Sequence, residues 1–120
     1  MFDMTDKGTG GMHPQDTEEY VDMTVTVKDK LIYSAEFECY DDELLRECAK
    51  TVCEVILEKP FEDVFQMNNK AVYYNIPCDL PRNKLYLATI AVMAAKKAVK
   101  NYAENNNIEL HLPDDGCTCI

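Results

Sequence analysis

Apolar and polar residues alternate from Val21 to Val27, which is the pattern of a strand with one buried face. The alternation resumes from Ile32 to Tyr40 after a polar turn at residues 28–30, so the two segments are predicted to form an antiparallel hairpin. One face of the second strand is expected to consist of Tyr33, Ala35, Phe37 and Cys39.

The spacing of apolar residues changes to a helical repeat between Leu45 and Ile56. Asp41 or Asp42 can supply the N-cap of this helix, because a carboxylate accepts hydrogen bonds from the free N–H groups of the first turn. Pro60 is expected to end it, and residues 62–67 are predicted to form a second, shorter helix.

Residues 71–76 fit either a strand or a helix, whereas residues 83–104 carry apolar side chains at helical spacing and predict one long helix. The polar, glycine-rich residues 1–16 are expected to form a flexible arm, and residues 105–120 an acidic tail with a Cys-x-Cys pair. Residues 17–104 then form one α+β domain, in which helices cover one face of a small antiparallel sheet.

The chain carries 12 Lys and Arg against 22 Asp and Glu, a net charge of −10. This sign opposes binding to phosphates, so we expect no nucleic acid partner. No apolar run approaches the roughly 20 residues that span a bilayer, and residues 1–11 lack the basic and apolar regions of a secretory signal. We therefore expect a cytoplasmic protein that binds other proteins and no membrane.

The segment from Met23 to Tyr102 resembles the N-terminal domain of NifU and the IscU-type scaffolds on which iron–sulfur clusters are assembled. The resemblance rests on the alternating first strand, the Ala-x-Phe-x-x-Tyr pattern at residues 35–40 and the Pro-Phe-Glu-Asp-Val sequence at residues 60–64. A Leu-Pro-x-x-Lys sequence at residues 80–84 and an alanine-rich final helix follow in the same order. It implies a small antiparallel sheet packed by several helices.

The resemblance also implies a cluster or zinc site built from three cysteines, an aspartate and a histidine, but the three cysteine positions hold other residues here. Glu19 stands nearest the family's aspartate, Asp42 replaces the second cysteine, and Tyr86 and Leu87 replace a His-Cys pair. Because the soft thiolate ligands are lost, we expect no cluster at this position. Glu19 and Asp42 remain there as oxygen donors for a metal.

Cys117 and Cys119 form a pair whose thiolates could bind iron, zinc or a cluster, or close a strained disulfide. Two ligands rarely hold such a centre alone, so Cys53, Cys78, His111, a second chain or a partner would have to complete it. The other interpretation of the pair is an ordinary chain terminus.

The remaining chemistry-bearing residues favour structural roles. Cys39 and Cys48 fall on apolar faces and are expected to pack as small hydrophobic residues. Six acidic residues lie between positions 36 and 47, where they could bind a hard cation or form an acidic patch facing solvent or a partner.

The two histidines, His13 and His111, have no nucleophile or carboxylate at a catalytic spacing, so we expect no enzyme. The leading interpretation is a non-enzymatic accessory in cluster, sulfur or metal trafficking. The resemblance implies a cysteine desulfurase and a chaperone as partners, with the chaperone contacting Leu80, Pro81 and Lys84. The alternatives are a thiol-based metal or sulfur carrier or redox protein that uses the Cys-x-Cys pair, and a structural adaptor.

Overall fold

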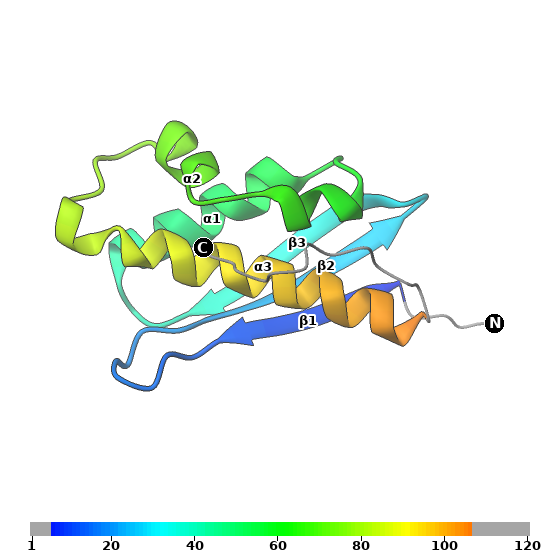
Figure 1. Ribbon diagram of the computed structural model, residues 1–120, viewed down its shortest axis with the longest axis horizontal. Helices are drawn as coiled ribbons and strands as arrows, with labels where there is room; N and C mark the ends of the chain where they lie inside the picture. The colour runs from blue at the N-terminus through cyan, green and yellow to red at the C-terminus, as the bar shows by residue number, and fades with distance from the viewer. Residues whose placement is uncertain (1–5, 107–120) are drawn as a thin grey trace.

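The computed structural model describes residues 6–106, which form a three-stranded antiparallel sheet in the order β1-β2-β3 with helices over one of its faces (Figure 1). The elements in chain order are β1 (Lys7–Met12), β2 (Val21–Lys28), β3 (Leu31–Cys39), α1 (Glu43–Ile56), the 3-10 helix η1 (Phe61–Gln66), α2 (Lys70–Asn75), the 3-10 helix η2 (Arg82–Lys84) and α3 (Tyr86–Asn105). The predicted α+β class is therefore confirmed.

The hairpin of β2 and β3 forms where the alternation predicts it. Asp29 and Lys30 both adopt left-handed conformations, with φ of 54° and 67°, and this geometry suits the twist of a tight hairpin turn. The apolar residues of β2 are all buried beneath the helices: Val21, Met23, Val25 and Val27. Residues between them point to the other face, which no helix covers within residues 6–106.

The predicted inner face of β3 is wrong at Tyr33. Val27 pairs with Ile32 and Thr26 pairs with Ser34, so Tyr33 is the extra residue of a β-bulge. The bulge turns Ile32 into the core, where it is fully buried, and leaves Tyr33 63% exposed. Simple alternation misplaces Tyr33 because one inserted residue exchanges the faces of every residue that precedes it.

β1 corrects the expectation that residues 1–16 form a flexible arm, because residues 7–12 pair with β2 along their whole length. Helix α3 runs along β1 (Figure 1). A Cβ atom at Gly8 or Gly10 would overlap the backbone of α3 at Ala98. The glycines therefore let strand and helix approach backbone to backbone, and the composition that suggested flexibility reflects close packing.

The helices otherwise follow the predicted pattern, with two refinements. The segment that fitted either a strand or a helix forms α2. The long helix begins at Tyr86, and the residues predicted as its start form η2. Along α3, alanines such as Ala91 and Ala95 are fully buried, and these small side chains let the helix lie close to both β1 and α1.

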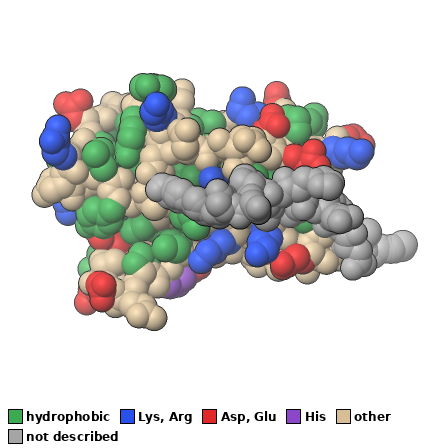
Figure 2. All heavy atoms as spheres, in the orientation of Figure 1, with side chains coloured by type: hydrophobic (Ala, Val, Ile, Leu, Met, Phe, Trp, Pro, Cys, Tyr) green, Lys and Arg blue, Asp and Glu red, His purple; other side chains and the backbone are tan. Residues whose placement is uncertain are grey.

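Two surface properties bear on the protein's partners. None of the helices within residues 6–106 combines the length and apolar character needed to cross a membrane. On the face drawn in Figure 2, acidic, basic and apolar side chains are interspersed and do not separate into large patches of one kind.

Candidate functional site

Three segments distant in sequence meet at one end of the sheet: the residues before β2, the residues after β3, and the start of α3 (Figure 1). The Tyr86 hydroxyl donates a hydrogen bond of 3.0 Å to Oε2 of Glu19, 67 residues earlier in the chain. The Tyr40 hydroxyl donates one of 3.0 Å to Oε1 of Glu18. We call Glu18, Glu19, Tyr40 and Tyr86, together with the adjacent Asp42, the tyrosine–carboxylate cluster.

Glu19 is the buried carboxylate of this cluster, with 8% of its surface exposed. Its Oε1 accepts a hydrogen bond of 2.9 Å from the Thr17 hydroxyl, and its Oε2 accepts the one from Tyr86. Burial of a carboxylate is costly unless its oxygens are hydrogen-bonded, and here two neutral hydroxyls satisfy them. Both oxygens of Glu19 are thus already engaged by protein groups.

The pKa values of the two tyrosines show how negative this region is. The hydrogen bond to Glu19 is the main cause that raises the pKa of Tyr86, and the charges of Glu19 and Asp42 add to it. The pKa of Tyr40 is raised in the same way, chiefly by its hydrogen bond to Glu18. Both phenols remain protonated at neutral pH, where each donates to a carboxylate.

Asp42, the remaining member of the tyrosine–carboxylate cluster, caps the N-terminus of α1. Its Oδ1 accepts a hydrogen bond of 3.0 Å from the Leu45 N–H, so Asp42 and not Asp41 is the N-cap of α1. Leu87, the other residue at which the resemblance implies a cysteine, is fully buried in the core. The structure therefore brings Glu19, Asp42 and Tyr86 to one place and directs Leu87 away from it.

No group of three or more His, Cys, Asp or Glu side chains within residues 6–106 is arranged to hold a metal ion. The oxygen donors predicted at Glu19 and Asp42 belong to no such group, and neither do the acidic residues between positions 36 and 47. In the structure, Glu19 accepts hydrogen bonds from Thr17 and Tyr86, and Asp42 accepts one from the first turn of α1.

The cysteines of the domain are packing residues or isolated thiols. Cys48 is fully buried and Cys53 is 7% exposed, and burial is the main cause that raises the pKa of each to about 12. Cys39 is half-buried beside β2, and burial raises its pKa as well. These positions confirm the packing roles predicted for Cys39 and Cys48. Cys78 is exposed in the connector between α2 and η2.

The predicted partner segment lies immediately before α3. Leu80 packs partly against the core, Pro81 is exposed, and Lys84 is half-buried. The predicted metal ligands Cys117 and Cys119 lie outside the described residues.

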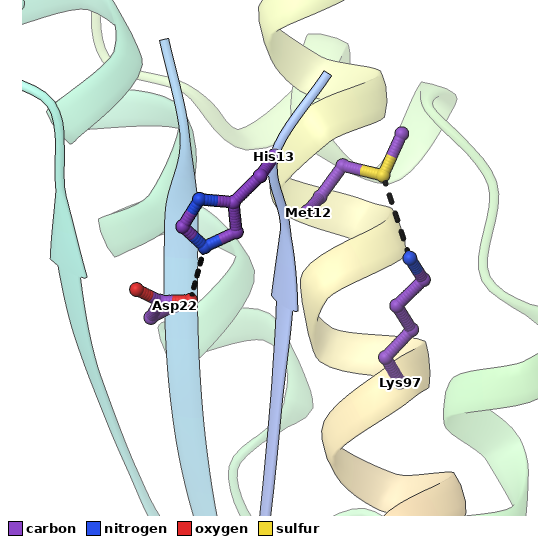
Figure 3. Close-up of polar contacts among 4 residues, drawn as sticks. All are labelled: Met12, His13, Asp22 and Lys97. Carbon is purple, nitrogen blue, oxygen red and sulfur yellow. Dashed lines mark hydrogen bonds and ion pairs between the residues drawn. The ribbon is translucent and has the colours of Figure 1, made fainter. Parts of the chain in front are cut away.

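A second polar arrangement, not predicted from the sequence, lies at the end of β1. The His13 ring stacks on Tyr20, with ring centres 5.0 Å apart, and its Nε2 lies 2.7 Å from Oδ1 of Asp22 on β2 (Figure 3). The preceding Met12 points to the opposite side of the strand, where its Sδ accepts from the Lys97 Nζ of α3 at 3.7 Å. In the sequence, the step from apolar Met12 to polar His13 is a signal of this alternation, which follows the glycines of β1.

No protein-family model matches the chain, and no curated protein matches it. The functional argument therefore depends on the residues themselves.

Proposed function

We propose that this protein is a NifU- and IscU-like scaffold homologue whose metal ligands have been replaced by a hydrogen-bonded cluster, and that it works in the cytoplasm as a non-enzymatic accessory in cluster, sulfur or metal trafficking. The observation that carries the proposal is the convergence of Glu19, Asp42 and Tyr86. These residues come from the three segments in which the resemblance places the ligands.

Two physical features support a role without a cluster at this position. The Glu19 oxygens accept from Thr17 and Tyr86, and Asp42 caps α1, so a metal would have to displace existing hydrogen bonds. The donors are also hard oxygens, whereas iron–sulfur centres require soft thiolates. The proposed activity is therefore contact with protein partners of the assembly machinery.

A binding experiment with a cysteine desulfurase tests this proposal. The purified full-length chain is titrated against the desulfurase from the same organism by isothermal calorimetry, and the desulfurase's sulfide production is followed in parallel. We expect saturable binding that survives replacement of Cys117 and Cys119 by serine. Absence of binding contradicts the proposal.

The same experiment separates the thiol-carrier alternative, which the Cys-x-Cys pair favours. A carrier accepts sulfur as a persulfide on one of these thiols, so mass spectrometry of the chain after turnover would show the added sulfur. If the sulfur appears and is lost in the double serine variant, the carrier function replaces the accessory function.

A further inference from the structure

The direction of the backbone hydrogen bonds shows which groups of the sheet are already paired. The Val27 N–H bonds to the Asp6 carbonyl, so the odd residues of β2 bond toward β1. The Tyr40 N–H bonds to the Tyr20 carbonyl, so the even residues of β2 bond toward β3. Since the two sides alternate along a strand, the main-chain groups of β3 that point away from the sheet belong to Ala35, Phe37 and Cys39.

The start of the β3 edge and the edge formed by β1 are both partly covered by other parts of the chain. At the start of β3, the Ile32 N–H donates to the Lys59 carbonyl at 2.9 Å, and the Glu58 N–H donates to the Ile32 carbonyl at 2.8 Å. On β1, the Thr9 N–H donates to Oδ1 of Asn101 at 3.0 Å, so α3 caps that edge. Within residues 6–106, no element other than β2 pairs with β3 between Ala35 and Cys39, so its outer edge is open there.

The open edge carries a negative outer face. Glu36 and Glu38 are exposed and form no ion pair with any residue between positions 6 and 106. Asp22 stands directly opposite Glu38, and its Oδ1 is hydrogen-bonded to Nε2 of His13. A hollow of about 470 Å³ lies over this face, lined by Asp22, Thr24, Glu36, Phe37 and Glu38. An added strand would place side chains beside two unneutralised carboxylates.

The same charges disfavour pairing of the edge with a second copy of the chain. Antiparallel pairing of two β3 strands about Phe37 would place Glu36 of each copy opposite Glu38 of the other. Like charges directly opposite each other destabilise a sheet. The net charge of −10 adds a general repulsion between copies.

We propose that the β3 edge from Ala35 to Cys39 binds a basic, extended segment of another protein, which adds to the sheet as an additional strand. A residue paired with Phe37 would face the helices, and its two neighbours would meet Glu36 and Glu38. Three successive residues of the bound segment would therefore be basic, apolar and basic. This inference rests on the sheet edge and its charges, and it does not depend on the proposed trafficking role.

A second hollow, of about 440 Å³, offers room for the middle, apolar side chain. It is lined by Tyr20, Phe37, Glu38, Cys39 and Arg46. Arg46 already pairs with Asp41 at 3.5 Å, and its positive charge disfavours a further basic residue on this side. Basic side chains are thus favoured on the outer face and an apolar one on the inner face.

A synthetic peptide tests the proposal on the full-length protein. The probe is a fluorescein-labelled peptide with the central sequence Thr-Lys-Val-Lys-Thr, and binding is followed by fluorescence anisotropy. Three comparison peptides carry Glu in place of both Lys, an N-methyl group on Val, or an N-methyl group on one Lys. In an antiparallel added strand, the Val N–H would pair with Phe37, whereas a Lys N–H would point away from the edge.

The matched protein variants change the charge by the same amount at two places. Glu36→Lys with Glu38→Lys reverses the edge, and Glu62→Lys with Asp63→Lys reverses two exposed acids on η1. We expect the edge variant to weaken binding of the Lys peptide about tenfold and to bind the Glu peptide instead, because cross-strand ion pairs are lost and regained. The η1 variant should bind the Lys peptide within about twofold of the parent.

Backbone pairing gives the second readout. Methylation of the Val nitrogen should abolish binding, whereas methylation of a Lys nitrogen should not. In NMR spectra, the bound peptide should slow hydrogen exchange at the amides of Ala35, Phe37 and Cys39. The proposal would be overturned if both charge variants weakened binding equally, or if the methyl-Val peptide bound as well as the unmethylated one. It would also be overturned if the parent chain, shown by circular dichroism to be folded, did not bind the Lys peptide.

Discussion

The hydrogen bond from Tyr86 to Glu19 links the start of α3 to the segment before β2. Tyr86 is 43% exposed, so water can replace part of what the hydroxyl provides. We expect Tyr86→Phe to lower the free energy of unfolding by about 1 kcal/mol at neutral pH, the typical value for such a hydrogen bond. Urea denaturation followed by circular dichroism measures this change. A variant as stable as the parent would mean that this hydrogen bond does not stabilise the contact between the two segments.

The pH dependence of stability gives a second signature of the same bond. The pKa of Tyr86 is raised in the folded protein, so its stabilising contribution is complete below the unfolded value near 10 and is lost as pH rises through the folded value. The parent should therefore lose stability more steeply than Tyr86→Phe as pH rises above the unfolded value near 10. Parallel pH profiles would contradict this assignment.

At the scale of elements, β1 is held to α3 by the absence of side chains at Gly8 and Gly10. Alanine at either position would push the strand away from the helix backbone at Ala98, which cannot rotate aside. We expect Gly8→Ala to cost about 2 kcal/mol or more in urea denaturation, as overpacking of a tight contact does.

Gly11→Ala is the matched control for this prediction. The atoms nearest to a Cβ at Gly11 would belong to the side chains of Asp22 and His13, which can rotate. Its cost should therefore be clearly smaller than that of Gly8→Ala. Equal costs at the two positions would show that the loss comes from strand propensity and not from contact with α3.

The elements with a clear period were predictable from the sequence, and the contacts between them were not. Alternation locates β2 and helical spacing locates α1, because each period directs apolar side chains to one face. The bulge at Tyr33 interrupts the alternation locally, and β1 has no apolar pattern because its inner face is built from glycine. Both features arise from neighbours in space, which a single sequence does not identify.

In the candidate site too, local interactions were predictable from the sequence and long-range contacts were not. The N-cap role of Asp42 is local, since its partner is three residues away, and the sequence predicted it for Asp41 or Asp42. The pairing of Glu19 with Tyr86 spans 67 residues and depends on how α3 meets the sheet. The resemblance seen in the sequence predicted that both residues lie near one site, but only the fold shows that a hydroxyl and a carboxylate form a hydrogen bond there.

For the whole molecule, the central claim is that three segments still converge as in a metal scaffold while hydrogen bonds have taken the place of ligands. The most direct measurement is the zinc content of two chains that both carry serine at Cys117 and Cys119. The first is otherwise the parent sequence. The second also carries Thr17→Cys, Asp42→Cys and Tyr86→His, which return soft ligands to the three segments beside Glu19.

Both chains are loaded with zinc, desalted and analysed for metal. The account predicts about one tightly held zinc per chain in the second protein, the loss of this zinc when position 42 carries serine in place of cysteine, and none in the first. Stoichiometric zinc in the first protein would contradict the claim that hydrogen bonds close the site. A second protein that keeps the parent's circular dichroism spectrum yet holds no zinc would contradict the convergence itself.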